Sequence, residues 1–550
     1  MRPPDATVTA ASASATSAWA PLKHPAFRML WAAWLAANVC MWTSDVAAAW
    51  LMTTLTTTPV MVALVQSAAT LPMLLLGLPS GAVADIVDRR RLLIGTQFWV
   101  AAVASTLWVA TFTGLLSAPL LLALTFANGI GLAMRWPVFA ALVPELVPRR
   151  ELGMALALNG VAMNLSRIIG PIIAGALIAT AGSAYVFLLN ALLSVLAGAI
   201  LLRWRREPAP AGLPRERFFG AIRVGLQYIR QSPPMHAVLL RVATFFVFST
   251  ALLALLPLVA KNLPEGNAGT FTLLMSAMGG GAVLAATFLP RLRQRTSMEA
   301  VARGGALLQA AATLAAAYAP NAALAAPAML AAGMAWIATA NSLTLAAQTA
   351  LPGWVKARGM AVYQMAMMGG TTFGSALWGQ VATLTDLRTS LVSAGLGGML
   401  ALVITGRWRV GAIDGADWTP VRSWKDPELA VPIGPYEGPV LVTIEYRIDP
   451  ARAKEFGELM SASRRVRLGN GAVSWELFRD AADPSRYLEH YMDESWVAHM
   501  RQHDRVTGFD VVLDRQKAAL HLGERPPEII HYIAEPVRRI KLPLDPRLRE

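Results

Sequence analysis

The sequence predicts an all-α polytopic membrane protein that carries a small α+β domain in its C-terminal part. Three observations lead to this fold class. Of 550 residues, 55% are hydrophobic and only 15% are charged, which is too apolar for a soluble chain of ordinary composition. Twelve apolar runs between residues 27 and 405 are long enough to cross roughly 30 Å of hydrocarbon as helices. Beyond residue 406 the chain becomes charged and its apolar runs become short.

The predicted segments follow from these changes in composition. The first residues are rich in Ala, Ser, Thr and Pro, so residues 1–26 are expected to form a disordered cytoplasmic N-terminus. The first apolar run is too long for a signal peptide and is expected to be the first spanning helix. The later segments are a first six-helix bundle (27–203), a cytoplasmic linker with an amphipathic helix (204–235), a second six-helix bundle (236–405), a linker (406–436), a cytoplasmic α+β barrel-like domain (437–535) and a tail (536–550).

The linkers between the apolar runs are of two kinds. Every second linker is basic, as in Arg89–Arg91, whereas the intervening linkers hold only Lys261 and Arg388 as basic residues. Because basic residues are retained on the cytoplasmic side, both termini are expected to be cytoplasmic. The runs lie near residues 27–52, 60–84, 92–114, 117–140, 154–180, 183–203, 236–260, 271–290, 301–319, 321–345, 359–383 and 387–405.

Charge and cysteine content exclude several classes of protein. The net charge is +14, but most arginines fall between apolar runs, so no nucleic-acid partner is expected. The single cysteine, Cys40, lies in an apolar run and supports neither an intramolecular disulfide nor a cysteine-based metal site.

The linker between the two bundles contains a basic amphipathic stretch. Phe218, Ile222, Leu226 and Ile229 recur at helical spacing, which predicts an interfacial helix with its basic side chains elsewhere. Its simplest role is to tether the two bundles.

A charged turn separates the second and third apolar runs. It reads Gly81-Ala-Val-Ala-Asp85-Ile-Val-Asp88 and continues as Arg89, Arg90 and Arg91. Its carboxylates can neutralise part of the basic charge or cap a helix end. The simplest interpretation is a basic loop that only orients the protein in the membrane.

This turn resembles the signature loop of the major facilitator superfamily of secondary transporters, in the form found in the branch that contains the enterobactin exporter. In that family the loop is a latch of the cytoplasmic gate. The resemblance implies that Asp85 meets the start of the eleventh spanning helix and that Gly81 permits this contact. It also implies a protein of the plasma (inner) membrane.

An internal repeat supports two six-helix halves. Gly153-Met-Ala155 and Gly170–Gly175 in the fifth run correspond to Gly359-Met-Ala361 and Gly374–Gly379 in the eleventh. Such parallel repeats are typical of transporters whose halves rock about a site near the membrane midplane.

The fifth run also carries a shorter motif. Gly170, Pro171 and Gly175 resemble the Gly-Pro motif of superfamily exporters. The alternative is that these glycines serve close helix packing alone.

Ionisable side chains inside the apolar runs are candidates for function because each costs free energy unless it is paired or hydrated. Asp45 shares a helix face with Asn38, and Arg167 shares one with Asn164. We expect Asp45 to be a proton-coupling carboxylate, with Arg167 as its counter-charge or as an anchor for an anion. A static ion pair between them is an equally good interpretation. Arg135 is expected to reach the cytoplasmic surface or to join the latch.

The C-terminal region reads as strand, helix, strand, strand, helix, strand, which is a ferredoxin-like order. The first strand is expected at 439–448 and the second helix from Ser495 to about Leu520. Trp475-Glu-Leu-Phe-Arg-Asp and Ser495-Trp-Val-Ala-His-Met resemble the antibiotic-biosynthesis-monooxygenase-like dimeric α+β barrel. The resemblance implies a possible homodimer through this domain.

This domain also carries a pair of histidines. His499 and His503 have the spacing of helical zinc ligands, but the glutamate of the His-Glu-x-x-His motif is absent. No metal site and no cofactor are therefore expected. His490 and Asp504 are the other acid–base candidates nearby.

Together these features predict a transporter and not an enzyme. No Walker A pattern is present, so ATP-driven transport is not expected. The favoured function is proton-coupled export of a small amphipathic molecule, such as a siderophore or a drug, across a lipid bilayer by alternating access. One alternative is a membrane-anchored enzyme whose C-terminal domain is a cofactor-independent monooxygenase. Another is a transporter whose C-terminal domain only dimerises or regulates.

Overall fold

A computed structural model describes residues 19–203, 218–264, 266–411, 421 and 431–535. The expected tail at 536–550, most of the N-terminal segment and much of the first part of the central linker lie outside these residues. The chain forms two compact units. A helical unit comprises residues 1–215, 239–345 and 361–410, and a second unit comprises residues 216–238, 346–360 and 411–550.

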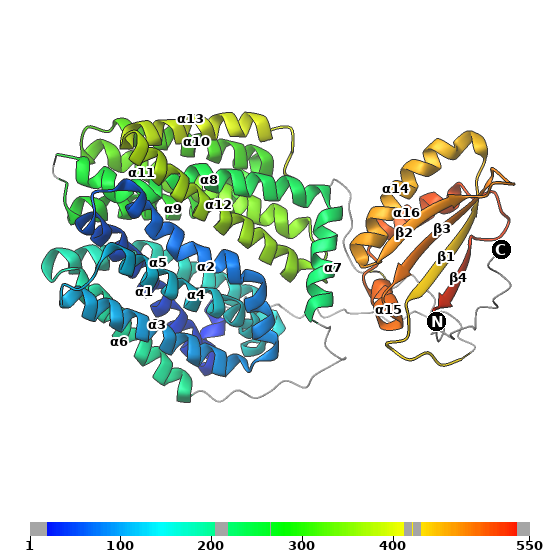
Figure 1. The fold of residues 1–550 in the computed structure, drawn as a ribbon, viewed down its shortest axis with the longest axis horizontal. Helices are drawn as coiled ribbons and strands as arrows, with labels where there is room; N and C mark the ends of the chain where they lie inside the picture. Colours follow the sequence, from blue (N-terminus) through cyan, green and yellow to red (C-terminus); the bar gives the residue numbers. More distant parts are fainter. Residues whose placement is uncertain (1–18, 204–217, 265, 412–420, 422–430, 536–550) are drawn as a thin grey trace, which may run out of the picture. The chain divides into compact units, whose positions relative to one another are not determined.

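A helix covers each of the twelve predicted apolar runs in the described part of the chain (Figure 1). The first half holds α1 (Pro25–Leu55), α2 (Pro59–Ile86), α3 (Arg89–Phe112), α4 (Ala118–Leu146), α5 (Leu152–Thr180) and α6 (Ser183–Arg203). The second half holds α8 (Pro233–Asn262), α9 (Ala268–Arg295), α10 (Met298–Tyr318), α11 (Ala322–Thr349), α12 (Lys356–Leu384) and α13 (Leu387–Thr405).

Ten of the helices among the described residues are long and apolar enough to cross a membrane. The helices α1 and α12 are long enough but are not among these ten. Their sequences are more polar, with Asn38 and Asp45 in α1 and Thr371, Thr372 and Ser375 in α12. Most of these polar side chains, namely Asn38, Thr371, Thr372 and Ser375, are buried inside the protein. The interior of the protein is where polar groups of a spanning helix are expected.

Two predicted boundaries near the helix ends are wrong. Ala20–Lys23 form a 3-10 turn and α1 begins at Pro25, so residues 20–23 and 25–26 are helical and not disordered as expected. The apolar run that was expected to end near residue 290 continues as helix, so the basic stretch 289–295 forms the last turns of α9. Pro290 lies inside this helix and does not end it.

The second unit is built on a four-stranded antiparallel sheet in the order β2-β3-β1-β4 (Figure 1). The strands are β1 (Val440–Arg447), β2 (Ser474–Arg479), β3 (Arg486–Asp493) and β4 (Glu528–Ile533). Three helices accompany it: α14 (Ala453–Asn470), α15 (Trp496–Asp504) and α16 (Gly508–Ala519).

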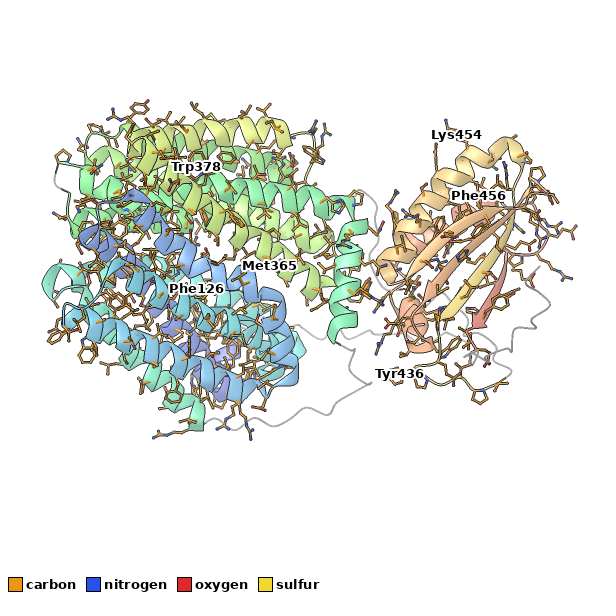
Figure 2. The ribbon with its side chains drawn as sticks, in the orientation of Figure 1. Phe126, Met365, Trp378, Tyr436, Lys454 and Phe456 are labelled. Carbon is orange, nitrogen blue, oxygen red and sulfur yellow. The ribbon has the colours of Figure 1, made fainter. Side chains whose placement is uncertain are left out.

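One face of this sheet forms the core of the second unit. Residues of β1 alternate between buried and partly exposed positions, so Val440, Val442 and Ile444 point to the core. Phe456 of α14 is fully buried against the sheet (Figure 2), and its ring lies 5.3 Å from the rings of Tyr446 and Tyr487. This alternation confirms the expected first strand.

The second helix of this region is not continuous as predicted. It divides into α15, which ends at Asp504, and α16, which begins at Gly508. Thr507 caps α16 through a capping box with Asp510, in which the backbone N–H of Thr507 donates to Asp510 Oδ2 at 2.8 Å. The Thr-Gly-Phe-Asp sequence is a recognisable start signal, so the break could have been predicted from it.

The amphipathic linker helix is confirmed as α7 (Phe218–Gln231), but its buried face differs from the predicted one. Val224, Tyr228 and Ile229 are buried, whereas Leu226 is exposed and Ile222 is half-buried. This face packs within the second unit, and a membrane-surface role for the opposite face stays a prediction.

Candidate functional site

The two halves of the helical unit meet along α2 and α12 through hydroxyl groups. Ser67 Oγ lies 2.7 Å from Ser375 Oγ and donates to the carbonyl of Thr372 at 2.9 Å. Thr70 Oγ1 and Thr372 Oγ1 are 2.8 Å apart. Because hydroxyls also bond to carbonyls of their own helices, they can exchange partners without leaving a charge unpaired. The contacts between α2 and α12 are therefore hydrogen bonds between uncharged groups, and we call this contact region the seam.

A second seam runs along α5, where the Gly-Pro motif lies. A Cβ atom at Gly170 would overlap Trp42 of α1, and a Cβ atom at Gly175 would overlap Thr272 of α9. Gly170 and Pro171 are both buried. These glycines therefore allow α5 to approach one helix of each half, which is the close-packing role that the sequence left open.

Within the described residues, one buried hydrophobic cluster joins the two halves, and it lies at one end of the bundle. There Val46, Ala63 and Ala174 of the first half join residues of the second half in one buried cluster. Lys261 Nζ donates to the carbonyl of Thr53 at 2.7 Å across the same end. This is the end at which α1 finishes and α2 begins.

The opposite end of the first half has a core of its own. Its buried cluster contains Phe27, Trp34, Leu142 and Leu158, and all of its members belong to the first half. Among the described residues, the cluster that joins the halves is thus confined to the other end. The arrangement is closed at one end of the seam.

The predicted charged residues lie on the helices beside this seam, but they do not form an ion pair. Asp45 is half-buried and has no hydrogen bond or ion pair among the residues that the structure describes. The Arg167 guanidinium instead lies over the Trp42 ring, 5.1 Å from its centroid. Asn164 is half-buried one turn away on α5. The static ion pair is therefore not formed in this arrangement.

Asn38, on the same helix as Asp45, is buried. Its amide Nδ2 donates to the carbonyl of Trp34 at 2.8 Å, while its Oδ1 has no hydrogen-bond partner within the described ranges. An acceptor without a donor in a buried site is unfavourable unless water or a ligand reaches it.

Arg135 does not reach the surface as expected. It is only 6% exposed and lies over the ring of Trp34, 5.5 Å from the centroid. It lines a cavity of about 20 Å³ inside the first half with Cys40 and Asn190. Asn190 Nδ2 donates to Ser44 Oγ at 2.7 Å. The Trp34 ring stacks on Phe139, and its face stabilises the Arg135 guanidinium by a cation–π interaction.

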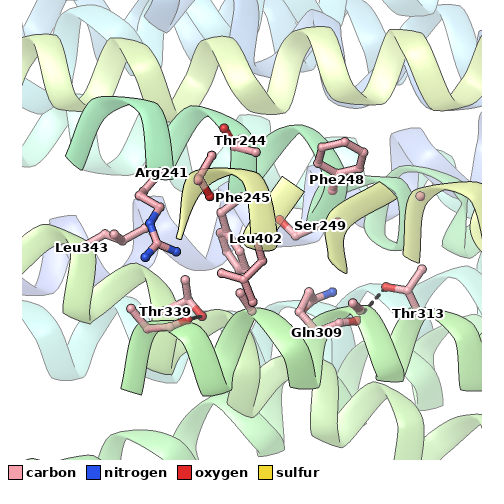
Figure 3. A pocket seen from close by; sticks show the side chains of 16 residues that line it. Arg241, Thr244, Phe245, Phe248, Ser249, Gln309, Thr313, Thr339, Leu343 and Leu402 are labelled. Atoms are coloured by element: carbon pink, nitrogen blue, oxygen red, sulfur yellow. Dashed lines mark hydrogen bonds between the residues drawn. The ribbon is translucent and has the colours of Figure 1, made fainter. Parts of the chain in front are cut away.

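A larger cavity of about 40 Å³ lies inside the second half, between α8, α10, α11 and α13 (Figure 3). These helices correspond in the repeat to α1, α3, α4 and α6, which enclose the first cavity. Gln309 is 3% exposed and lines the second cavity, and neither its Nε2 nor its Oε1 has a partner among the described residues. Gln309 could not be predicted as a cavity residue, because a single glutamine in an apolar run has no distinguishing local pattern.

Glu299 joins three elements at the mouth of this second cavity. Its carboxylate accepts from Arg241 and Arg303, and its Oε2 accepts from the backbone N–H of Val410 at 2.8 Å. Arg241 is 6% exposed, so Glu299 supplies the charge that this buried guanidinium needs. The i,i+4 spacing of Glu299 and Arg303 is a local signal, but Arg241 and Val410 are too far away in the chain to be predicted as their partners.

The gate-loop residues are described only in part. Asp88 caps α3, since its Oδ1 accepts from the Arg91 backbone N–H at 2.9 Å, and this confirms the predicted capping role. Arg90 Nη2 donates to the carbonyl of Leu202 at 2.6 Å. Gly81 and Asp85 lie in the last turns of α2, but their side-chain surroundings are outside the described part, so the latch contact stays a prediction.

The interior of the second unit holds a fully buried carboxylate, Glu489. It accepts from Tyr446 Oη at 3.0 Å, Ser463 Oγ at 2.9 Å and Trp475 Nε1 at 2.8 Å, and Lys517 Nζ lies 3.8 Å away. Burial alone would raise the pKa of Glu489, but the Lys517 and Arg467 charges and these hydrogen bonds hold it below its ordinary value.

The cavity that borders this network does not resemble an organic substrate site. It has a volume of about 10 Å³, roughly the room of one water molecule. Its lining is polar and charged, with Arg467, Asn470, Asp510 and Asp514 among its residues. The closed apolar pocket that a monooxygenase would need is not formed at this place.

Within the second unit, α7 and residues 346–360 pack on the α+β domain. Gln227 Nε2 donates to the carbonyl of Ala472 at 2.5 Å, and Tyr228 Oη donates to the carbonyl of Ala350 at 3.2 Å. The Trp354 ring lies between the Tyr228 ring, 5.7 Å away, and the Arg505 guanidinium, 4.5 Å from its centroid. The chain that connects α11 to α12 is thus held by the C-terminal domain.

A histidine group in the same domain includes a residue that the sequence did not suggest. His531 of β4 joins His499 and His503 of α15, and one ring nitrogen of each lies within 4.8 Å of the others. Burial, and then the neighbouring histidines, lower the pKa of both His503 and His531 to about 4. His490 lies apart from them, stacked on Phe478. Asp504, the last residue of α15, is exposed.

Comparison with known proteins gives a family. The model of the transmembrane secretion effector family matches residues 16–539. The chain is 26% identical over 266 residues to a staphyloferrin A transporter of Staphylococcus aureus. This match covers 47% of this chain and 65% of that protein. It is also 26% identical over 200 residues to macrolide efflux protein A of Enterococcus faecalis, covering 36% and 62%. The matches thus span about two thirds or less of these relatives.

Solved structures share the fold of the helical unit. The nucleoside transporter NupG aligns with a TM-score of 0.59 at 12% identity, over 69% of this chain and 99% of that one. A bacterial homologue of the human lysosomal transporter Spinster, in an inward-facing and occupied conformation, aligns with a TM-score of 0.57 at 14% identity, over 70% and 97%.

Proposed function

Because the chain belongs to the transmembrane secretion effector family, a group of major facilitator transporters, we propose that it is a secondary transporter that works by alternating access. The observation that carries this proposal is the asymmetry of the seam between the halves. One buried cluster joins the halves at one end, and the cluster at the opposite end draws on the first half alone. Transporters of this architecture alternate access by rocking their halves about a central site, and a cluster that joins the halves at one end supports such a mechanism.

The proposed direction is export, and the proposed substrate is a small amphipathic molecule such as a siderophore or a drug. The names of two relatives, a staphyloferrin A transporter and a macrolide efflux protein, support this substrate class. The Gly170-Pro171 motif and the gate loop, which resembles that of the enterobactin-exporter branch, support it independently.

Proton exchange is the proposed driving force, with Asp45 as the coupling carboxylate. Asp45 precedes Val46, a member of the cluster that joins the halves, and it has no hydrogen bond or ion pair among the described residues. Its protonation would therefore break no structural contact among them. Arg167, held over Trp42, is the proposed anchor for an anionic group of the substrate.

Membrane placement follows from the family and from the apolar helices. The protein is a multi-pass membrane protein. We further propose twelve spans, with α1 and α12 included, a plasma (inner) membrane location and cytoplasmic termini. The basic linkers at 89–91, 149–150 and 291–295 support this orientation.

For the C-terminal domain we propose a ferredoxin-like fold with a regulatory role. The element order and the strand order β2-β3-β1-β4 support the fold. The packing of Trp354 and Tyr228 on the domain supports regulation, because residues 346–360 lead directly into α12, one side of the seam. The monooxygenase alternative has no comparable observation in its favour.

The same domain is also the proposed site of homodimerisation. The sheet face away from the helices carries exposed apolar side chains, namely Phe478, Leu488, Ile530 and Tyr532. Such a patch on a small domain is typical of an interaction surface.

A disulfide across the seam tests alternating access. Ser67→Cys and Ser375→Cys are introduced together with Cys40→Ala, which removes the only native thiol. Because the two hydroxyl oxygens are 2.7 Å apart, oxidation should link α2 to α12 and stop uptake of a fluorescent drug into inverted vesicles. Reduction should restore it. The single variants are the controls, and transport that continues in the linked protein would contradict the proposal.

The regulatory role is tested separately by Trp354→Ala. Losing this ring removes the contacts with Tyr228 and Arg505, so we expect a change in the transport rate with the domain still folded. Trp99, exposed on α3 with its Nε1 bonded to the Ala127 carbonyl, gives a matched Trp→Ala control. Equal rates in wild type and Trp354→Ala would exclude control through this contact.

A further inference from the structure

Three histidines of the C-terminal domain converge from two elements. His499 and His503 are one helical turn apart on α15, and their Nε2 atoms are 3.0 Å apart. His531 lies on β4 opposite Val442, so its side chain is on the helix-covered face of the sheet. One ring nitrogen of each residue lies within 4.8 Å of the other two.

The orientation of the central histidine is fixed. His499 is fully buried, and its Nδ1 lies 2.9 Å from Asp493 Oδ2, so the imidazole donates its proton to the carboxylate. Gln502 Nε2 donates to the other oxygen of Asp493. The Nε2 lone pair of His499 therefore points away from Asp493 and toward His503. A carboxylate that orients a histidine in this way is the usual partner of a metal-binding imidazole.

The third histidine carries an unused nitrogen. His531 Nε2 is buried and has no hydrogen-bond partner among the residues that the structure describes. Its ring centroid lies 4.9 Å from that of His499, and Trp496 covers both rings at 5.5 and 6.4 Å. A buried nitrogen without a partner is costly, and the same nitrogen beside two others is not costly if a cation fills the space.

We propose that His499, His503 and His531 bind a divalent transition-metal ion of the zinc class, with Asp493 as the positioning residue for His499. Three imidazole nitrogens are the donors of open zinc sites, and the fourth position is then left to water or a small ligand. A tetrahedral ion with Zn–N bonds of about 2.0–2.1 Å needs donor atoms about 3.4 Å apart. The three nitrogens, which lie within 4.8 Å of one another, would have to close to this spacing when an ion binds.

The site would connect parts of the domain that are otherwise separate in sequence. His499 and His503 belong to α15, and His531 belongs to the edge strand β4. An ion that bridges them would hold the last strand to the helix layer, so metal occupancy would control how firmly β4 is attached. This role does not depend on the transported substrate.

The test uses the full chain, purified in detergent with an affinity tag that contains no histidine and stripped with a chelator. Titration with Zn²⁺ against a competing chromophoric chelator should give one tight site per chain. His503→Ala and His531→Ala should each weaken binding by more than the roughly 10–100-fold expected for Asp493→Asn. His490→Ala is the matched control, because His490 stacks on Phe478 away from the group, and its affinity should equal that of wild type.

A second measurement does not depend on the variants. Co²⁺ added to the stripped wild-type chain should give the intense visible absorption of a four-coordinate ion, and Zn²⁺ should displace it. Zinc affinity that is the same in wild type, His503→Ala and His531→Ala would overturn the proposal. A six-coordinate, weak Co²⁺ spectrum in the wild-type chain would overturn it as well.

Discussion

The seam between the two helical halves and the interior of the C-terminal domain handle buried polar groups in opposite ways. In the domain, Glu489 is surrounded by hydrogen-bond donors and by the Lys517 and Arg467 charges. At the seam, Asp45 and Arg167 form no ion pair within the described residues, and small hydroxyl side chains make the contacts between halves. Removing any partner of a buried charge is costly, so the Glu489 network holds its neighbours in place. Hydroxyl and glycine contacts leave no buried charge unpaired when two helices separate. The difference is consistent with a rigid C-terminal domain and with the proposed movement of the two helical halves.

The largest expected effect is on the compensated carboxylate. Glu489→Gln would remove the fully buried counter-charge of Lys517 and Arg467 and leave them only Asp514, whose side chain is 38% exposed. We expect this to cost about 3–5 kcal/mol of the stability of the domain. Native-state proteolysis of the full chain measures this as faster cleavage of the C-terminal domain. Glu476, with a 61% exposed side chain, provides the control Glu476→Gln, for which we expect almost no change. Equal cleavage of Glu489→Gln and Glu476→Gln would show that the buried Glu489 charge does not stabilise the domain.

The next prediction concerns packing at the seam. Gly175→Ala adds a methyl group that overlaps Thr272, so α5 and α9 must separate, at about 1–3 kcal/mol. The melting temperature in detergent and the transport rate should both fall. Gly160 lies on the same helix with open space around its Cβ position, so Gly160→Ala should leave both unchanged. If Gly175→Ala and Gly160→Ala give the same melting temperature and transport rate, close packing of α5 on α9 at Gly175 does not contribute to stability or transport.

A smaller effect is expected for the unpaired carboxylate. Asp45→Asn should lower proton-coupled transport by at least about tenfold, equal to about 1.4 kcal/mol, without lowering the melting temperature. The physical reason is that the amide cannot carry a proton, while no hydrogen bond or ion pair of Asp45 in the described chain is lost. Dye-reported proton release from inverted vesicles measures the transport step.

The matched control for that change is Asp386→Asn. Asp386 caps α13, where its Oδ1 accepts from the Thr389 backbone N–H at 2.9 Å, and asparagine caps helices equally well. Transport should be unaffected. A stability loss in Asp45→Asn would identify a structural partner and contradict its assignment to proton coupling.

The smallest effect is a pH dependence of the domain. The folded pKa of Glu489 is lowered, so its contribution to stability is complete above the ordinary glutamate value of 4.5 and is lost as pH falls below it. Proteolysis of the wild-type domain should therefore accelerate below about pH 4.5, and Glu489→Gln should lack this component. An identical acid profile in both chains would show that the Glu489 charge adds no stability.

Local patterns predicted much of the helical unit. Hydropathy located the twelve runs because a spanning helix is continuous in sequence, and the carboxylate at Asp88 indicated a helix cap. The break between α15 and α16 was missed although Thr507 and Asp510 signal it, since the apolar spacing on either side suggested one helix.

The sites were less predictable because they depend on contacts between distant residues. His531 lies 28 residues after His503, Glu299 is 58 residues from Arg241, and Gln309 has no sequence signal of a cavity. The expected Asp45–Arg167 pair failed for the same reason: depth along two helices does not fix which way the side chains turn, and Trp42 holds the guanidinium instead.

The most direct test of the central claim, that the two halves rock about their seam, is a pair of distances measured by pulsed electron paramagnetic resonance in the Cys40→Ala chain. One label pair, Leu115→Cys with Leu384→Cys, reports on the joined end, where both side chains are exposed. The other, Arg150→Cys with Arg295→Cys, reports on the opposite end. With substrate and a proton gradient, we expect one distance to lengthen while the other shortens. Distances that stay constant, or that change in the same direction during transport, would contradict it.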